Sequence, residues 1–213
     1  MSRPILHGIA GSPFVNSARL TLDEKGVDYV FAEMPFGVGA HKTPEHLARN
    51  PFGRIPVLEH DGFLVYETQA IMRYVDRAFP GPALQPTDVR ALARMDQLLN
   101  MNDWYVFPSI TFGIAFQRLI LPQMGGTPDE EKIAAALPQA RVCLSEIERL
   151  MGDSAYLAGN ALSLADLIMA PPFGYFVMTP ESRELMKPHA RLNAWWTRMS
   201  ARDSLQRARP KAA

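Results

Sequence analysis

NPFGRIPVLEHDGFLVYETQAI, residues 50–71, decides the fold of this chain of 213 residues. The order of its residue types predicts a turn, a strand, a hairpin, a second strand and the start of a helix, which together make one supersecondary unit. Residues 57–58 begin the first strand, and Asp61-Gly62 is a strong hairpin signal. Residues 63–65 form the partner strand, and Glu67-Thr68 opens an amphipathic helix.

The Ile55-Pro56 turn and the Glu67-Thr68 helix start are the two features of this stretch that bear on ligand binding. Pro56 precedes a strand, where its missing N–H is tolerated, and a trans Ile55-Pro56 bond is the default for such a residue pair. Glu67 and Thr68 place an acidic and a hydroxyl side chain at a helix N-terminus, where backbone N–H groups and the dipole attract an anion. The combination indicates an exposed backbone edge beside a carboxylate site.

In this order and spacing the stretch resembles the glutathione transferase family, and the resemblance covers nearly the whole chain. It implies a cis Pro56, with the main chain of Ile55 paired to the cysteinyl part of glutathione. It also implies that Glu67 and Thr68 hold the γ-glutamyl end of the same tripeptide.

The composition is that of an ordinary globular protein, with 47% apolar residues. The 22 basic and 22 acidic residues balance, so neither nucleic acid nor an anionic membrane is suggested as a partner. A single cysteine, Cys143, excludes an internal disulfide framework and indicates a reducing compartment. We find no signal-peptide core and no run long and apolar enough to span a bilayer, and we therefore expect a soluble cytoplasmic protein.

Residues 1–79 are expected to form a thioredoxin-like α/β domain. A short strand, a helix over 12–26 and a strand over 28–34 precede the stretch quoted above, and a short helix begins near Thr43-Pro44. A right-handed crossover after the first strand and a hairpin at the end give the thioredoxin-like order of elements.

Ser12 has a structural and a chemical interpretation. A serine N-cap followed by Pro13 is the expected start of a helix, and capping alone, at about 1 kcal/mol, explains it. The same hydroxyl can donate to a bound thiolate, whose charge the helix dipole favours. Lowering the pKa of a thiol from about 8.5 by two units needs only about 2.7 kcal/mol. In the resemblance, SPFVNSARLTLDEKG matches the first-helix pattern and Ser12 falls on the catalytic serine of the serine-type classes.

The chain also departs from other classes of the family. Many members carry a tyrosine at the end of the first strand, where this chain has His7-Gly8, and redox-type members carry a cysteine in the loop that here has none. Asn16 lies one turn into the helix, and we expect it either to support Ser12, to contact the sulfur, or simply to face solvent.

Four further residues complete the expected site and subunit contact. His41-Lys42 lies nine positions before Asn50, the spacing of phi-like members, in which this pair meets the glycine carboxylate of glutathione; a solvated loop pair is the alternative. Arg54 stands where those members commonly have glutamine, and its contact stays open. Phe52 lies in a turn, which leaves a local core role or insertion into a second subunit, and the resemblance favours the second.

After a Pro-rich and Gly-containing linker, residues 80–86, the pattern of residues 87–213 is helical throughout. The first long helix runs to Pro108, where it must kink or end. An aromatic stripe follows, and at helical spacing such a stripe is more often core than ligand pocket. The resemblance implies instead a hydrophobic substrate site, to which we assign Phe14, Trp104, Phe107, Phe112 and Phe116.

Ser163-Leu164-Ala165-Asp166 has the pattern of a capping box before a buried helix. An aspartate at the third helical position is explained by capping, so we do not assign Asp166 a catalytic role. The same stretch in the family caps a central buried helix and acts in folding.

Together these observations predict a thioredoxin-like domain joined to an all-helical domain, with reduced glutathione bound at the first and a small apolar electrophile between the two. The thiolate attacks an electrophilic carbon without a metal, and positioning and anion stabilisation supply the catalysis. The resemblance also implies a homodimer with a role in detoxification.

Three alternatives stay open. One is an isomerase that uses glutathione as a cofactor, as zeta-like members do, although their SSC-type loop is absent here. Another is a peroxidase that acts on organic hydroperoxides. The third is a non-catalytic interaction module of the same fold, since fold alone does not fix activity.

Overall fold

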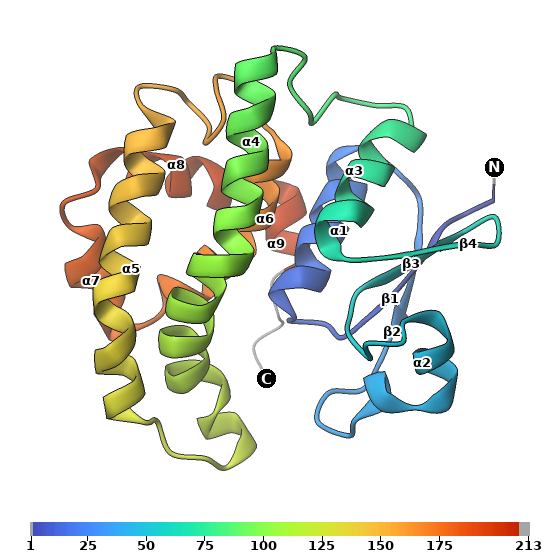
Figure 1. Cartoon of the computed structure of the whole chain (residues 1–213), viewed down its shortest axis with the longest axis horizontal. Coiled ribbons are helices and arrows are strands. Elements are labelled where there is room, and N and C mark those ends of the chain that lie inside the picture. The colour runs from blue at the N-terminus through green and yellow to red at the C-terminus, as the bar shows by residue number, and fades with distance from the viewer. Residues whose placement is uncertain (1, 209–213) are drawn as a thin grey trace. The chain divides into compact units, whose positions relative to one another are not determined.

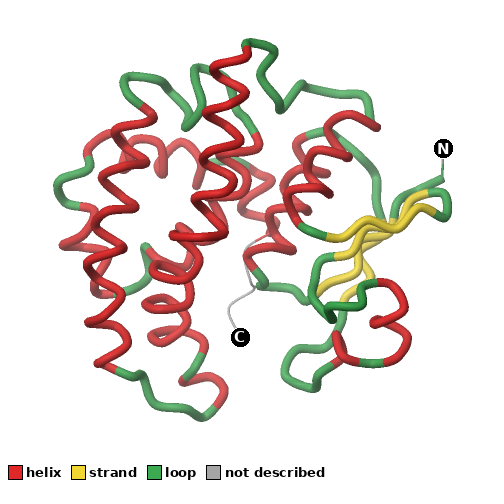
Figure 2. Tube along the Cα trace, in the orientation of Figure 1, coloured by secondary structure: helices red, strands yellow, loops and turns green. Residues whose placement is uncertain are grey.

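The structure is a computed structural model, and it describes residues 2–208 (Figure 1). Within these residues the chain divides into two compact units, one of residues 2–84 with 203–208 and one of residues 85–202. The strands of the described residues all belong to the first unit, and the second is built from helices and loops (Figure 2).

The first unit contains one mixed sheet with the strand order β2-β1-β3-β4. Its strands are β1 (Ile5–Gly8), β2 (Val30–Glu33), β3 (Val57–His60) and β4 (Phe63–Tyr66). β1 and β2 are parallel, whereas β3 is antiparallel to both β1 and β4. The hairpin between β3 and β4 turns at Asp61 (φ 50°) and Gly62 (φ 78°), and this pair of left-handed residues confirms the Asp-Gly hairpin.

Helices α1 (Pro13–Glu24) and α3 (Thr68–Ala78) pack on each other and on the sheet, and together they form the core of this unit. The fully buried residues of this core come from β1, β3 and both helices: Leu6, Val15, Ala18, Leu22, Leu58, Ile71 and Val75. The short helix α2 (Pro44–Arg49) begins where the sequence predicts, because the Thr43 side chain accepts a hydrogen bond from His46 N at 3.4 Å. The thioredoxin-like α/β arrangement is therefore confirmed.

Helix α9 (Asp203–Ala208) joins the first unit, although the sequence pattern groups it with the helical domain. The reason is a set of side-chain contacts with α1 that no local pattern reveals. Ser204 Oγ donates a hydrogen bond to Glu24 Oε1, and Arg207 Nε lies 3.6 Å from Asp23 Oδ2. Residues 209–213 of the expected helical domain lie outside the described residues.

A buried ion pair holds the beginning of the expected linker against the first unit. Lys25 Nζ lies 3.1 Å from Asp76 Oδ1 and donates to Pro82 O at 2.9 Å, and both charged side chains are almost fully buried. The same Asp76 oxygen accepts a hydrogen bond from Leu84 N at 2.9 Å. The first unit consequently extends to Leu84, which lies inside the linker expected over 80–86.

The second unit is helical, as expected. Its elements are α4 (Val89–Met101), the π-helix Asn102–Ile120, the short 3-10 helix Pro122–Met124, α5 (Glu130–Met151), α6 (Leu164–Phe176), α7 (Pro180–Met186) and α8 (Ala190–Ser200). Phe173, Phe176 and Trp195 are its largest fully buried side chains. Over the residues that the structure describes, every helix is too short or too polar to cross a membrane.

A kink or an end is expected at Pro108, and the helical conformation continues through this proline as far as Ile120, so the alternative of an end is wrong. The segment is a π-helix, whose hydrogen bonds join residues five apart, and Leu121 N accordingly donates to Phe116 O at 2.9 Å. A proline disrupts an α-helix because it lacks an N–H and its ring meets the preceding turn, and the wider π-turn relieves that contact.

The predicted capping box is present at the start of α6. Asp166 is fully buried, and its Oδ2 accepts hydrogen bonds from Ser163 N at 2.9 Å and Ser163 Oγ at 2.8 Å. Its Oδ1 accepts from Leu157 N at 2.9 Å and from Trp195 Nε1 at 2.8 Å. Burial raises the pKa of this carboxyl, and the four donors oppose the rise. Asp166 thus joins a loop, the start of α6 and helix α8, which is a structural role.

We predict that Asp166→Ala lowers the free energy of unfolding by about 3 kcal/mol or more, because it leaves several buried donors without an acceptor. Chemical denaturation of the full chain measures this change. Asp153→Ala is the matched control, since the Asp153 side chain is fully exposed and its loss is expected to change stability by less than about 0.5 kcal/mol. Equal effects of the two substitutions would contradict the structural role of Asp166.

Candidate functional site

The strand register brings the predicted glutathione-binding segments to one end of the sheet. His7 in β1 pairs with Val57 in β3, and Val57 pairs with Tyr66 in β4. The chain therefore leaves β1 toward Ser12, enters β3 from Pro56 and leaves β4 toward Glu67 at the same end. This end of the sheet, with the loops that leave it, is the candidate functional site.

Ser12 is the N-cap of α1, as predicted. Its Oγ accepts a single long hydrogen bond, 3.5 Å from Val15 N, and Ser12 N donates to Ile9 O at 3.2 Å. Among the described residues no acceptor receives the hydroxyl proton of Ser12. Because the side chain is half-buried at a helix N-terminus, it can donate to an anion that enters the site.

The peptide bond between Ile55 and Pro56 is cis, as the resemblance implies, so the default expectation of a trans bond is wrong here. Two buried side chains form hydrogen bonds to the backbone of the turn that precedes this peptide bond. His46 Nε2 lies 2.9 Å from Arg54 O, and Asn50 Nδ2 donates to the same oxygen at 3.0 Å. His46 is not predictable from the sequence, because a histidine in a short helix gives no local signal of this contact.

Glu67 adopts φ 69° and ψ 116°, a conformation that a non-glycine residue rarely takes. It precedes α3, and no side-chain hydrogen bond caps that helix. Thr68 is buried at the first helical position, whereas Glu67 is exposed. Unfavourable backbone conformations concentrate at ligand sites, and an uncapped helix N-terminus attracts a carboxylate, so both features agree with the anion site predicted here.

The loop before α2 lies against the turn that carries Phe52 and Arg54. His41 and Lys42 belong to a short 3-10 helix, Ala40–Lys42, and Lys42 Nζ donates to Phe52 O at 3.3 Å. Gly53 (φ 56°) fits between them, since a Cβ there would lie 2.8 Å from Lys42 Nζ. The segment of His41 and Lys42 therefore lies against the turn of residues 52–54 that precedes the cis bond.

Phe52 is 64% exposed, so the alternative of a local core role is wrong. Its ring meets Tyr66 edge-to-face, with 6.0 Å between the ring centroids. A large apolar side chain that stands out of a turn in this way is suited to a partner surface.

Asn16 is 3% exposed, so the alternative in which it faces solvent is also wrong. Its backbone N–H donates to Ser12 O at 2.9 Å, which places it one helical turn after the N-cap. The buried side-chain oxygen Oδ1 has no hydrogen-bond partner within the described part of the chain.

None of the aromatic residues assigned to the substrate site is fully buried within the described part of the chain. In the second unit, Trp104 is 73% exposed and Phe112 53% exposed, which contradicts a core role for these two. Phe112 stacks on Phe116 with 4.9 Å between the ring centroids, while Phe107 is half-buried. In the first unit, Phe14 is also half-buried, at the second position of α1.

The pKa values of His7, in β1, and of Cys143, in the second unit, are shifted from their usual ranges. Burial lowers the pKa of His7, and the hydrogen bond to Glu59, with 3.3 Å between Nε2 and Oε2, partly opposes this shift. Burial raises the pKa of the Cys143 thiol, which lies 3.8 Å from Ser109 Oγ in the second unit. A buried thiol with a raised pKa is unreactive, so Cys143 serves as a packing residue.

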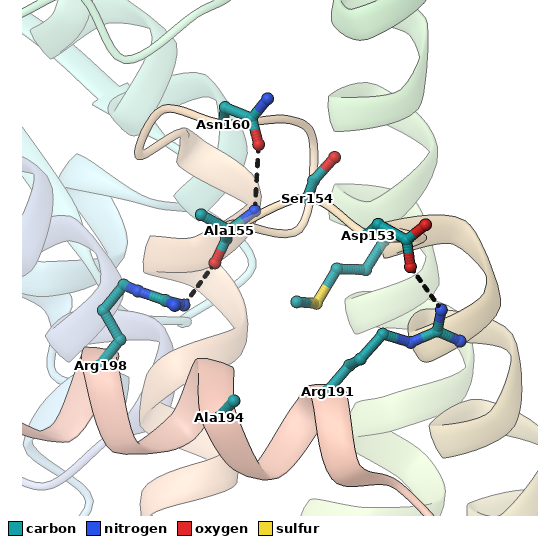
Figure 3. A pocket seen from close by; sticks show the side chains of 8 residues that line it. Asp153, Ser154, Ala155, Asn160, Arg191, Ala194 and Arg198 are labelled. Carbon is teal, nitrogen blue, oxygen red and sulfur yellow. Dashed lines mark hydrogen bonds and ion pairs between the residues drawn. The ribbon is translucent and has the colours of Figure 1, made fainter.

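A pocket of about 370 Å³ lies within the second unit, and its lining includes none of the predicted site residues (Figure 3). Its two arginines already have partners. Arg191 Nη1 lies 3.1 Å from Asp153 Oδ1, and Arg198 Nη1 donates to Ala155 O at 2.6 Å. We assign no ligand to this pocket.

Two family comparisons cover most of the chain. Residues 3–77 match the family described as "Glutathione S-transferase, N-terminal domain", and residues 89–203 match "Glutathione S-transferase, C-terminal domain". A rice protein (Oryza sativa subsp. japonica) named "Probable glutathione S-transferase GSTF2" is 33% identical over 95% of this chain and 94% of its own length. "Glutathione S-transferase 4" from maize (Zea mays) is 34% identical over 92% of this chain and 87% of its own length.

Solved structures agree with this result. The crystal structure of glutathione transferase F7 from Populus trichocarpa has a TM-score of 0.87 at 28% identity and covers 96% of this chain and 97% of its own. Glutathione S-transferase I from maize, in complex with an atrazine glutathione conjugate, has a TM-score of 0.86 at 29% identity and covers 97% of this chain and 96% of its own. On the matches to both family domains and on these relatives, the chain belongs to the glutathione S-transferase family.

Proposed function

We propose that this protein transfers the thiolate of reduced glutathione to small apolar electrophiles, and that Ser12 stabilises the sulfur anion. The observation that carries this proposal is the position of Ser12, whose hydroxyl caps α1 at the same end of the sheet as Ile55-Pro56 and Glu67. A hydroxyl donor at a helix N-terminus combines a charge-assisted hydrogen bond with a favourable dipole.

The energy required of Ser12 is modest. A thiol of reference pKa about 8.5 is mostly protonated at neutral pH, and a fall of two units corresponds to about 2.7 kcal/mol. A hydrogen bond to a charged group contributes about 1.5–3 kcal/mol, and a helix N-terminus adds about 0.3–1 kcal/mol. These two contributions are sufficient without a metal ion, and the remaining catalysis comes from holding the two reactants together.

The tripeptide is proposed to lie across the end of the sheet. Glu67 and Thr68 bind its γ-glutamyl end at the uncapped start of α3, and the main chain of Ile55, before Pro56, pairs with the cysteinyl part. The glycine carboxylate then meets the cationic segment of His41, Lys42 and Arg54. Arg54 offers a planar, bidentate donor for a carboxylate, and Lys42 a point charge.

Exposed aromatic rings are proposed to bind the electrophile. Trp104 and the stacked pair Phe112 and Phe116 offer flat apolar surfaces, and Phe107 and Phe14 are the further members that we assign to this function. Flat rings stack on one another favourably, which suits an aromatic electrophile. The maize relative was solved with an atrazine glutathione conjugate, which is a conjugate of an aromatic ring.

We further propose that the protein is a cytoplasmic homodimer that acts in detoxification. The exposed Phe52 supports the dimer, since burying such a ring in a partner contributes about 1.5–3 kcal/mol. The single, buried cysteine is in keeping with a reducing compartment. The relatives named above are transferases, so the isomerase, peroxidase and interaction-module alternatives are not favoured.

Ser12→Ala removes the hydrogen bond but leaves the helix N-terminus, so it is expected to raise the pKa of bound glutathione by about one to two units and to lower kcat/KM at neutral pH by about ten- to a hundredfold. The pH dependence of conjugation with an activated aryl chloride gives both values. Ser17→Ala serves as the control, because Ser17 Oγ donates to Pro13 O one turn further along the same helix. A Ser12→Ala variant that retains the wild-type pH profile would refute the role of this hydroxyl.

Thr68→Val is expected to raise KM for glutathione by about tenfold and to change kcat little, because a hydrogen bond to the ground state contributes about 1 kcal/mol or somewhat more. Steady-state kinetics at saturating electrophile separate the two constants. Thr127→Val makes the same chemical change at an exposed position in the second unit and is expected to have no effect. If kcat fell in Thr68→Val while KM stayed constant, this residue would not belong to the glutathione-binding set.

Phe52→Ala removes one buried ring from each subunit of the proposed dimer, so it is expected to raise the dissociation constant by about a hundredfold or more. Sedimentation equilibrium of the full chain measures this constant. Phe36→Ala removes another exposed phenylalanine from the first unit and is expected to leave the dimer unchanged. A wild-type chain that sediments as a monomer, or equal effects of both substitutions, would exclude the proposed contact.

A further inference from the structure

Asn16 is a polar residue within the buried part of helix α1. The residues on either side of it, Val15 and Ser17, are also almost fully buried, and Asn16 itself is 3% exposed. Ser17 uses its hydroxyl within the helix, where it donates to Pro13 O at 3.0 Å. The Asn16 oxygen Oδ1, in contrast, has no partner among the described residues.

An unpartnered buried acceptor is unfavourable for folding, and most buried polar groups in native proteins are hydrogen-bonded. Leucine has the same branching and the same number of non-hydrogen side-chain atoms as asparagine, and it has no polar group that needs a partner. Residues that lower the stability of a fold in this way are often found at functional sites. Asn16 therefore calls for an explanation outside the stability of the fold.

Asn16 follows Ser12 by one turn of α1. Asn16 N donates to Ser12 O at 2.9 Å, so the two residues are separated by one helical turn on the same face. Side chains on an α-helix lean toward its N-terminus and cover the preceding turn. The turn that precedes Asn16 is the one that carries the Ser12 hydroxyl.

Ser12 has capacity for another hydrogen bond. Its Oγ accepts only the 3.5 Å bond from Val15 N, although a hydroxyl oxygen accepts two hydrogen bonds and donates one. A half-turn of the Asn16 carboxamide exchanges its oxygen and nitrogen without changing the shape of the side chain, so the same buried position can hold a donor. A donor there is favoured once a negative charge lies beyond Ser12.

We propose that Asn16 is a positioning residue, whose carboxamide N–H donates to Ser12 Oγ when a thiolate is bound, so that the Ser12 hydroxyl proton points at the sulfur. This inference rests on the proposed function and deepens it. The two bonds form a chain from Asn16 through Ser12 to the anion, and hydrogen bonds in such a chain strengthen one another. Asn16 acts through Ser12 and does not itself touch the sulfur.

Asn16→Leu tests this inference, because it retains the branching of the side chain and removes its hydrogen-bonding groups. The readout is the ultraviolet absorbance of the thiolate of bound glutathione, titrated with pH on the full chain. We expect the pKa of the bound thiol to rise by about half a unit to one unit, which corresponds to about 0.7–1.4 kcal/mol. The melting temperature is expected to stay constant or to rise, since an unpartnered buried oxygen is removed.

Thr21→Val is the matched control. Thr21 is a buried polar residue of the same helix, but its hydroxyl already donates to Ser17 O at 2.9 Å, and it lies more than a turn beyond Asn16. We expect Thr21→Val to leave the pKa of the bound thiol at the wild-type value. An equal shift in Thr21→Val and Asn16→Leu would show a general effect of altering the helix and would overturn the inference.

The double variant Ser12→Ala/Asn16→Leu separates action through Ser12 from direct action on the sulfur. If Asn16 acts through Ser12, the second substitution adds no shift once the hydroxyl is gone. An undiminished shift in the double variant overturns the positioning role, and so does an Asn16→Leu variant with an unchanged thiol pKa and a lowered melting temperature. A Ser12→Ala variant that itself keeps the wild-type thiol pKa overturns the proposed function and this inference together.

Discussion

The register of four short strands is the constraint on which the candidate site depends. Because His7 pairs with Val57 and Val57 with Tyr66, the chain segments before and after these strands leave the sheet at a common end. A slip of one residue would exchange the two faces of a strand and would move Pro56 and Glu67 away from Ser12. The buried core of β1, β3, α1 and α3 opposes such a slip, so the packing of apolar side chains maintains the arrangement of the polar ones.

Much of this arrangement is predictable from the sequence, because the signals are local. The Asp61-Gly62 pair predicts a hairpin since both residues tolerate left-handed conformations, and the structure has both of them there. Ser12-Pro13 and Thr43-Pro44 predict helix starts since capping chemistry acts within one turn, and both helices begin at those residues. Ser163 and Asp166 likewise lie three residues apart, and the Asp166 carboxylate accepts two hydrogen bonds from Ser163.

Other features depend on contacts between distant segments, and the local pattern does not contain them. The burial of Asn16 and the contact of His46 with Arg54 O arise from tertiary packing. The π-helix of residues 102–120 passes through Pro108, where rules for α-helices require a break. The exposure of Trp104 and Phe112 also escapes a periodicity argument, because a π-helix turns its residues at a different spacing from an α-helix.

The place of α9 in the first unit has a consequence for how the protein is made. Asp203–Ala208 packs on α1 through Ser204 and Arg207, yet the whole second unit lies between these segments in the chain. During synthesis residues 2–84 leave the ribosome before the second unit does. The face of α1 that α9 covers therefore stays exposed until the intervening helices have been translated. Its final closure is therefore a long-range event late in biosynthesis, and the helical unit has time to fold on its own before the last turn of chain docks.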